Sequence, residues 1–406
     1  MRTLRVLQVH NRPRQPGGAD RMVDQERAVL IEHGHKVQQW RLNSQSLSGV
    51  RAGLAAIWNP SARRSLRAAV AEFRPDLVHL HTPFPFLSAA IFSAFDELPL
   101  IHTVHSYRWS CIAGTHFRDG KTCNDCVGRT IPFPAARHRC YQDSLVPSLA
   151  LAAGLTTHRL TGSLDRIDRV VTFSPSTAEH LIRTAVAPEK IAVLPNFVED
   201  PGPVTEHDDG YALFLGRLTE EKGIVTLVQA WTQHRREPGL RLKIVGDGPL
   251  GSWVRSIAGT HQEIDFLGWR DRDFVGDLLR RASCLVFPSE WYEGMPLSIL
   301  EAFACGVPVL VSDVGNYWRM VEPGRTGHVF RAQDPADLAR LVDNLAAHPD
   351  VLTQMRPRSR AVYEERHTPS AGYRRLYELY CEVLDEKQAA TTPERPLGNT
   401  PGDPSG

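Results

Sequence analysis

Short apolar runs alternate with longer amphipathic segments along most of the chain. Runs such as VVTF, LKIV and VPVLV are apolar throughout, which is typical of strands buried on both faces of a parallel sheet. Residues 223–235 and 335–347 repeat their apolar positions at helical spacing, and this alternation predicts doubly wound α/β domains. The expected strands form two series: Leu4–Val9, Lys36–Arg41, Asp76–Leu80, Pro99–Val104 and Arg169–Phe173, then Tyr211–Leu215, Leu240–Gly246, Ile264–Gly268, Cys284–Phe287 and Val307–Val311.

The segment Pro195–Gly210 separates the two series. It reads PNFVEDPGPVTEHDDG, and its prolines, glycines and acidic cluster predict a linker. A chain of 406 residues is also too long for one hydrophobic core. We therefore expect a first domain over 1–203, a second over 204–368, a C-terminal helix within 369–390 that includes Tyr373–Leu384, and a disordered tail over 391–406.

Composition narrows the function class. Lys plus Arg number 47 and Asp plus Glu 46, so the net charge is +1 and gives no reason to expect a nucleic-acid partner. No apolar run approaches the ~20 residues that span a bilayer. A strand-like segment begins at Leu4, so no signal peptide is expected and a cytoplasmic protein is the default. The oligomeric state cannot be read from these features.

One loop and helix, from Ser289 to Gly306, carry two separated carboxylates. The loop follows a predicted strand, Pro296 suits the first helical turn, and Gly306 suits the helix end. Glu293 lies in the loop and Glu301 on the helix. Two carboxylates that frame one ligand can accept hydrogen bonds from separate sugar hydroxyls, although an acidic loop residue and a solvated helix residue are the plainer reading.

Three more loops follow predicted strands of the second series. Arg217 and Lys222 offer cations for a diphosphate, whose charge builds up on a leaving group. The VGDGP turn at 245–249 lets backbone approach a ligand, and Gly268 ends the next strand. Because carboxyl ends of parallel strands meet at one sheet edge, these loops and the Ser289–Gly306 segment predict one nucleotide-sized cleft.

These motifs together resemble the donor-binding domain of the retaining family 4 glycosyltransferases, which have the GT-B architecture of two Rossmann-like domains facing a cleft. The shared pattern is GRLxxEKG at 216–223, GDGP at 246–249, FLG at 266–268, and glutamates at 293 and 301. The resemblance implies transfer of a hexose-type sugar from a nucleoside-diphosphate donor, with a UDP-sugar favoured. The acceptor would contain sugar: a polysaccharide repeat, a lipid-linked glycan or a natural product.

The resemblance also implies a role for each motif residue. Arg217 and Lys222 would bind the diphosphate, Glu301 the ribose hydroxyls, and Glu293 the transferred sugar. Backbone near 268–270 would meet the base. The implied catalytic residues are His105, Arg217, Lys222 and Glu293, and the implied donor-binding residues are Gly17, Gly18, Arg217, Lys222, Gly246, Gly248, Gly268, Trp269, Arg270, Glu293, Gly294, Met295, Pro296, Leu297 and Glu301.

The first domain offers matching parts. The segment 16–19 (PGGA) resembles the family's glycine-rich loop, so backbone amides of Gly17 and Gly18 would face the donor diphosphate. His105 would be the family's histidine that hydrogen-bonds the donor sugar, although Ser106 follows it where the family often has Asp. His79 is expected to have a structural role, because side-chain alternation along its predicted strand directs it to the buried interior. His81 is expected to line the acceptor pocket.

No Asp-x-Asp motif ends a predicted strand to hold Mg²⁺, so Arg217 and Lys222 would replace a metal and no cofactor is expected for catalysis. The family's retention of configuration at the anomeric carbon is ascribed to attack from the same face that the phosphate leaves. The leaving phosphate takes the acceptor proton, so no general base is assigned. Two alternatives stay open: an enzyme like the UDP-N-acetylglucosamine 2-epimerases of the same fold, or a nucleotide-sugar-binding protein without catalysis.

A cysteine-rich stretch lies inside an insertion of the first domain at about 106–165, a kind of segment that usually shapes a binding site. The spacing of Cys111, Cys123, Cys126 and Cys140 fits a closed tetrathiolate zinc site. Free thiols, a redox pair and an iron–sulfur cluster are the alternatives.

The segment Arg51–Arg74 combines Arg63, Arg64 and Arg67 with Leu54, Ile57 and Trp58. A basic amphipathic helix of this kind can rest on an anionic membrane, which would make the protein peripheral at the inner membrane face. The plainer reading is a solvated helix of the first domain.

Overall fold

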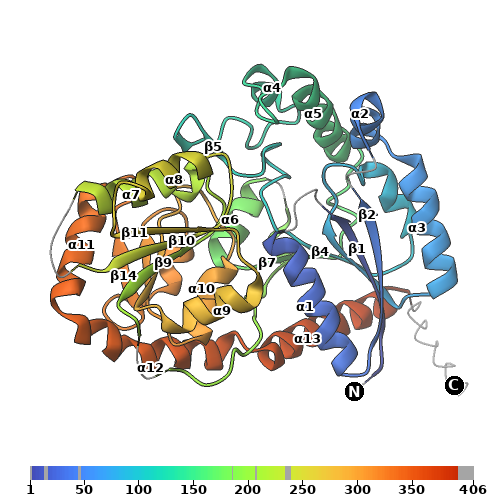
Figure 1. Ribbon diagram of the computed structural model, residues 1–406. Helices are drawn as coiled ribbons and strands as arrows, with labels where there is room; N and C mark the ends of the chain where they lie inside the picture. The colour runs from blue at the N-terminus through green and yellow to red at the C-terminus, as the bar shows by residue number, and fades with distance from the viewer. Residues whose placement is uncertain are drawn as a thin grey trace, which may run out of the picture.

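The structure is a computed structural model that describes residues 2–12, 17–43, 47–184, 186–205, 208–233 and 239–391. It has two α/β lobes, each built around a six-stranded parallel sheet (Figure 1). The first sheet has the order β2-β1-β3-β4-β7-β8. Its strands are β1 Arg5–Arg12, β2 Lys36–Asn43, β3 Leu77–Thr82, β4 Leu100–Thr103, β7 Arg169–Thr172 and β8 Ile191–Val193.

The second sheet has the order β11-β10-β9-β12-β13-β14. Its strands are β9 Tyr211–Leu215, β10 Arg241–Val245, β11 Ile264–Gly268, β12 Cys284–Phe287, β13 Val309–Ser312 and β14 Gly327–Phe330. The strand order reverses direction at β9, between β10 and β12, and such a reversal opens a crevice at the carboxyl ends of parallel strands. The loops after these strands are those that carry the candidate site.

Helices cover both faces of each sheet. The first lobe contains α1 Gly18–Glu32, α2 Gly49–Ile57, α3 Pro60–Phe73, η2 Ala89–Ala94, α4 Phe133–Arg137, α5 Leu145–Leu160, α6 Pro175–Arg183 and η3 Pro188–Lys190. The second contains η4 Glu220–Lys222, α7 Ile224–Gln233, α8 Gly251–Ala258, α9 Arg272–Arg281, α10 Leu297–Ala304, η5 Tyr317–Met320, α11 Pro335–Ala347 and α12 Pro349–Arg366.

The predicted α/β fold is confirmed, and all ten expected strands are present. The apolar runs were sufficient signals because helices bury both faces of these strands, as the fully buried core of β1 shows. Within the two six-stranded sheets, the sequence pattern missed β8 and β14. β8 has three residues and β14 reads GHVF, so neither offers a long apolar run.

The first sheet ends at Val193 and the second begins at Tyr211, and the expected boundary at residue 204 falls between them. The C-terminal helix α13 (Pro369–Thr391) leaves the second lobe and packs on the first. There the Tyr380 hydroxyl lies 2.7 Å from Nδ1 of His79. The predicted tail over 391–406 lies outside the described residues beyond Thr391.

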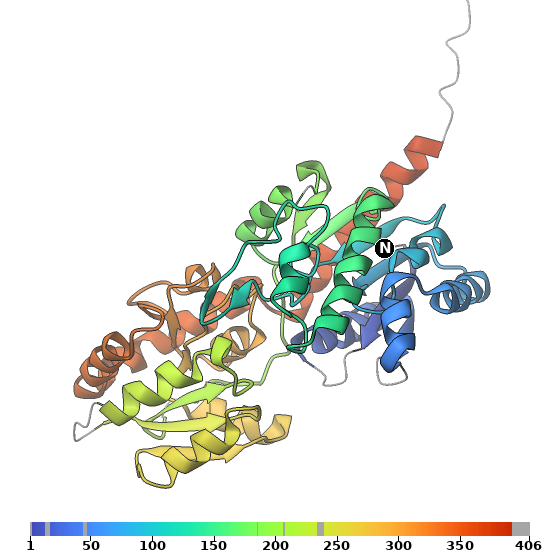
Figure 2. The ribbon, with the colours of Figure 1, turned by 90° about the horizontal axis from the view of Figure 1, so that it is seen from above.

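The insertion at 106–165 forms its own layer on the first lobe. It contains a small antiparallel hairpin of β5 (Phe117–Arg118) and β6 (Lys121–Thr122), followed by α4 and α5. Gly154 lets α5 cross α2 closely, because a Cβ there would lie 2.3 Å from the carbonyl oxygen of Ala56. Seen from above, the hairpin extends from the first lobe toward the second (Figure 2).

Candidate functional site

Glu293 is the most heavily bonded residue of the predicted cleft. Its Oε1 accepts hydrogen bonds from Trp291 Nε1 at 2.9 Å and Ser289 Oγ at 3.1 Å, and it forms an ion pair with the Lys222 ammonium. The side chains of Glu293 and Lys222 are 12% and 18% exposed. The structure thus brings together two residues that lie far apart in sequence, and it pairs them directly rather than leaving each open.

Arg217 lies in the same loop as Lys222 but points into solvent. Its side chain is 60% exposed, and its guanidinium is 3.8 Å from the Glu221 carboxylate. Such a loose, exposed pair is worth at most ~1 kcal/mol, so a diphosphate can displace it. The cation is therefore available at the carboxyl edge of the sheet, beside the Lys222–Glu293 pair.

Gly246 and Gly248 have a packing role in addition to the donor-binding role expected of them. A Cβ on Gly246 would lie 1.8 Å from the Gly216 carbonyl oxygen, and one on Gly248 would lie 2.7 Å from that of Leu218. Both glycines therefore let the 246–249 turn pack against the loop that carries Arg217. They shape the site through this loop-on-loop contact.

The predicted base-binding segment is open. Gly268 has a φ of +69° and nothing within 4 Å of where a Cβ would be, and the Trp269 side chain is 71% exposed. The guanidinium of Arg270 lies over the Phe274 ring at 5.4 Å. A flat, exposed indole beside a backbone turn offers a surface on which a base can stack.

Glu301 lies on α10 and forms an ion pair with Arg21 of α1 across the two lobes. Pro296 is the residue that precedes this helix, one position earlier than expected, and Leu297 begins it. A Cβ on Gly18 would lie 3.8 Å from Leu297 Cδ1, so the start of α1 faces the start of α10. No sequence pattern identifies Arg21, which is one of several charged positions on an ordinary amphipathic helix.

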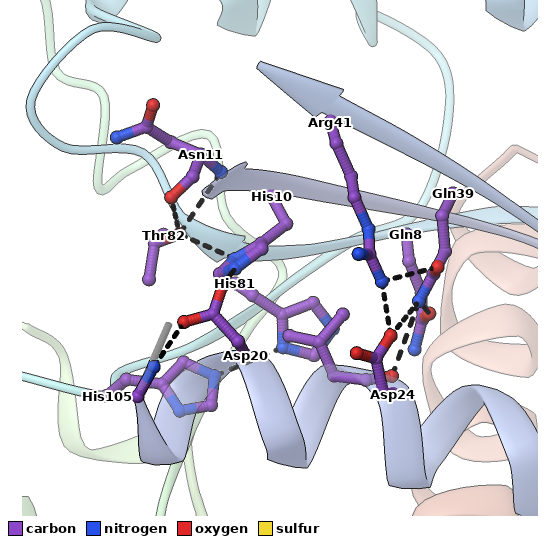
Figure 3. Close-up of polar contacts among 12 residues, drawn as sticks. Gln8, His10, Asn11, Asp20, Asp24, Gln39, Arg41, His81, Thr82 and His105 are labelled. Atoms are coloured by element: carbon purple, nitrogen blue, oxygen red, sulfur yellow. Dashed lines mark hydrogen bonds and ion pairs between the residues drawn. The ribbon is translucent and has the colours of Figure 1, made fainter. Parts of the chain in front are cut away.

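The glycine-rich segment is described from residue 17 onward, and Pro16 lies outside the described residues. The backbone N–H of Gly17 donates to Asp20 Oδ2 at 2.8 Å, so this amide already has an acceptor. Asp20 in turn bonds His10 Nε2 at 2.9 Å, and His10 Nδ1 bonds the Thr82 hydroxyl at 2.7 Å (Figure 3). The burial of Asp20 acts to raise its pKa, but the bonds from His10 and Gly17 outweigh it and the pKa is lowered.

His105 follows β4 and lies 3.2 Å, between ring nitrogens, from His81 at the end of β3 (Figure 3). Both line a hollow in the first lobe, together with Phe84, Arg108 and Trp109. Burial is the main cause that lowers the pKa of both imidazoles, and neighbouring histidines lower it further. Neutral rings can exchange hydrogen bonds with sugar hydroxyls without carrying charge.

Behind His81 lies a buried group formed by Glu26, His79 and Tyr380. Glu26 Oε2 is 3.5 Å from a nitrogen of each of His79 and His81. Burial raises the pKa of Glu26 to about 8 and lowers that of His79 to about 3, so these contacts join neutral groups. The nitrogens of His79 bond Tyr380 and Thr103 at 2.7 Å, which agrees with its predicted structural role and leaves neither nitrogen free for a metal.

Phe173 connects the two halves of the site. Its ring lies 5.4 Å from that of His105, and a Cβ on Gly294 would approach its Cδ2 to 3.5 Å. Next to it, Asn196 donates from Nδ2 to the Met295 carbonyl at 3.1 Å. The Glu293 loop of the second lobe and His105 of the first therefore face one cleft.

The four clustered cysteines all line a single pocket of the insertion. The predicted amphipathic helix at 51–74 is instead two helices. α2 ends at Ile57 and α3 begins at Pro60, with the Asn59 side chain accepting from the N–H of Ala62. No described helix is long and apolar enough to cross a membrane.

Both lobes match known families. Residues 16–200 match the family model described as Glycosyltransferase Family 4, and residues 209–348 match that described as Glycosyl transferases group 1. Glycogen synthase of Mycobacterium tuberculosis is 28% identical over 323 residues, which cover 78% of this chain and 69% of the relative.

Solved structures share the fold of the whole chain. Sucrose-phosphate synthase from Thermosynechococcus elongatus has a TM-score of 0.68 at 19% identity and covers 94% of this chain and 100% of its own. Anabaena HepE in complex with UDP and glucose has a TM-score of 0.65 at 17% identity, and the match covers 93% of this chain and 99% of that chain. At this identity they establish the GT-B fold alone.

Proposed function

Because the chain belongs to the family 4 and group 1 glycosyltransferases, we propose that it moves a hexose-type sugar from a nucleoside-diphosphate donor to a sugar-containing acceptor, with retention at the anomeric carbon. One observation carries the proposal: the Lys222–Glu293 pair and the exposed guanidinium of Arg217 lie in loops at the carboxyl edge of the second sheet. The Glu293 loop, at Gly294, and His105 of the first lobe both lie against Phe173. A UDP-sugar is the favoured donor, since a protein of the same fold binds UDP with glucose.

The charges suit departure of a diphosphate. As the glycosidic bond breaks, negative charge builds on the phosphate oxygen, and Lys222 and Arg217 are placed to stabilise it. Lys222 can turn from Glu293 to the phosphate, which frees the carboxylate to accept hydrogen bonds from sugar hydroxyls. In this mechanism two side-chain cations perform the work that a divalent metal performs in other transferases, and no cofactor is needed.

The first lobe would bind the acceptor. The hollow beside His105 is lined by His81, Arg108 and Trp109, so hydrogen-bonding groups surround the place proposed for the acceptor. His105, held neutral by burial, would bond a hydroxyl of the donor sugar. The acceptor hydroxyl attacks the face from which the diphosphate leaves and gives its proton to the departing phosphate oxygen, so no protein group serves as base.

A membrane surface is proposed as a peripheral partner. Exposed apolar side chains gather on α2, on α4 and on α5, which packs against α2: Val50, Leu54, Trp58, Ile131, Phe133, Leu145, Val146 and Leu149. Large exposed apolar patches mark interaction sites. Arg51 on α2 and Arg137 on α4 supply positive charge that suits anionic lipid.

A thermal-shift screen of nucleotide sugars, followed by transfer assays with the donor that binds, tests the enzymatic proposal. A donor at 100 times its dissociation constant should stabilise the protein by about 2.7 kcal/mol. Formation of an α-linked product from an α-configured donor is the expected result. Release of free N-acetylmannosamine from UDP-N-acetylglucosamine would instead identify an epimerase, and donor binding without turnover on a broad acceptor panel would favour a sensor.

A further inference from the structure

The cysteine-rich insertion brings four thiols to one place. Cys111, Cys123, Cys126 and Cys140 come from three separate turns, yet all four line one small pocket. Every cysteine of the chain is free of disulfides. Four soft ligands around one small hollow are a donor set that selects zinc over the hard cations Mg²⁺ and Ca²⁺.

Two of these thiols lie on a knuckle. The β5–β6 hairpin runs directly into Cys123, whose N–H donates to the His116 carbonyl at 2.7 Å. The chain then turns tightly, with the N–H of Val127 bonded to the carbonyl of Asn124 at 3.1 Å. A hairpin followed by a turn with two intervening residues sets both sulfurs on the same side, as a chelate requires.

Arginines surround the cluster. Arg118 interacts electrostatically with Cys123 and Cys140, Arg108 with Cys111, and Arg159 with Cys126. Arg108 is partly buried and its guanidinium donates to the Ile112 carbonyl at 2.6 Å. Arg118 also pairs with Asp125 at 3.1 Å, and Arg159 donates to the Trp109 carbonyl at 3.0 Å, so these cations are held beside the thiols by other contacts. Four thiolates around Zn²⁺ would carry a net charge of −2, which the neighbouring arginines would help to balance.

The sulfurs stand wider apart here than in a closed site. Within the described part of the chain, Glu26, His79 and His81 form the one group of three or more ligand atoms that lie within 4.8 Å of one another. Sulfurs at about 2.3 Å from one tetrahedral zinc are roughly 3.8 Å apart. Metal binding would therefore draw the loops of the insertion inward.

We propose that Cys111, Cys123, Cys126 and Cys140 bind one structural Zn²⁺, and that this ion fixes the β5–β6 hairpin in its position between the lobes. The hairpin tip reaches the second lobe, where Gln333 Nε2 donates to the Gly120 carbonyl at 2.6 Å and to Glu290 Oε2 at 3.0 Å. Glu290 belongs to the loop that carries Glu293. The zinc therefore supports a bridge from the insertion to the donor-side loop, without contacting substrate.

Metal analysis of the full chain, purified without metal-affinity resin, tests the site independently of the proposed function. We expect about one zinc per chain in the wild type and in Cys381→Ser, a control on α13, and less than about 0.2 in Cys123→Ser. Wild-type protein with less than about 0.2 zinc, with iron and sulfide in place of zinc, or with a disulfide among the four cysteines would overturn the proposal.

If Cys123→Ser does not fold, the site can be tested in the wild-type protein by replacing its metal with Co²⁺. A tetrathiolate site gives the intense visible bands of tetrahedral Co²⁺ and sulfur-to-metal charge transfer, and zinc should displace it at one equivalent. Hydrogen exchange measures the bridge: removal of the metal should speed exchange over 115–128 by at least tenfold and leave β9–β13 unchanged. An unchanged hydrogen-exchange rate over 115–128 in metal-free protein would show that the ion does not support the hairpin.

Discussion

The guanidinium of Arg21, on the first helix of the first lobe, forms an ion pair with the Glu301 carboxylate on α10 of the second lobe. The two side chains are 38% and 22% exposed, so the pair is worth at most ~1 kcal/mol and a ligand can displace it. If Glu301 accepts hydrogen bonds from ribose, Arg21 competes for the same carboxylate.

This relationship predicts opposite effects of two substitutions on donor binding. Glu301→Gln should raise the Kd for UDP about tenfold, since a hydrogen bond to a charged group contributes ~1.5–3 kcal/mol. Arg21→Ala should leave that Kd unchanged or lower it, because a competitor is removed. Isothermal titration measures both, and a Kd raised tenfold or more in Arg21→Ala would show that Arg21 binds the donor itself.

Lys222→Ala should lower transfer by at least ~100-fold, the scale seen when one preorganised charge-stabilising group is removed. Because Lys222 and Glu293 are paired, the single variant also leaves a largely buried carboxylate without its cation. Rates of Lys222→Ala, Glu293→Gln and the double variant separate the two contributions. Arg281→Ala, an exposed cation of the same lobe, is the control, and near-normal transfer by Lys222→Ala would exclude a role in catalysis.

Transfer should not require Mg²⁺ or Mn²⁺, since Arg217 and Lys222 supply the positive charge. After dialysis against EDTA, activity should be insensitive to added Mg²⁺ or Mn²⁺. Zinc lost from the cysteines would confuse the assay, so one sample is refilled with Zn²⁺ and Cys123→Ser is measured alongside. Activity abolished by EDTA and restored by Mg²⁺ or Mn²⁺ but not by Zn²⁺ would contradict the mechanism.

Glu26 should make the free energy of unfolding fall as the pH rises. Burial raises its pKa from 4.5 to about 8, so the folded state holds a proton that the unfolded state releases between these values. Stability from this group is present below pH 4.5 and is lost as pH rises toward 8, at up to ~1.4 kcal/mol per pH unit. The buried His79 and His102, with pKa values of about 3 and 4, act oppositely but only below about pH 6.5.

Between pH 6.5 and 8 the Glu26 effect should therefore dominate. Denaturant unfolding of the wild type should show stability falling over this range, while Glu26→Gln should show a flatter profile. Glu72→Gln, an exposed position on α3, should behave like the wild type. Parallel profiles for all three proteins would mean that Glu26 is ionised in the fold.

The apolar surface on α2 and α5 should bind anionic vesicles. Leu54→Ser with Val146→Ser should reduce co-sedimentation with phosphatidylglycerol vesicles at least fivefold, because each exposed side chain loses contact with the acyl region, worth ~1 kcal/mol or more. Val193→Ser, at an exposed position on β8, is the control. Equal sedimentation of the surface variant and wild type would place the membrane contact elsewhere or exclude it.

Sequence alone determined the fold and the position of the loops that are proposed to bind the donor. Apolar runs such as CLVF at β12 identify buried parallel strands, because two layers of helices leave such strands no polar face. Once the strands are placed, the loops that follow them must meet at one edge. Arg217, Lys222 and Glu293 could therefore be assigned to one cleft from their positions after strands.

Tertiary structure decided which of these groups touch. The pairing of Lys222 with Glu293, and of Arg21 with Glu301, depends on side-chain rotamers and on how the two lobes meet, which no local pattern encodes. The packing role of Gly246 and the neutral pair of His81 and His105 likewise arise from residues distant in sequence. Periodicity reports which face of an element is buried, but the partner that buries it is fixed only when the whole chain is folded.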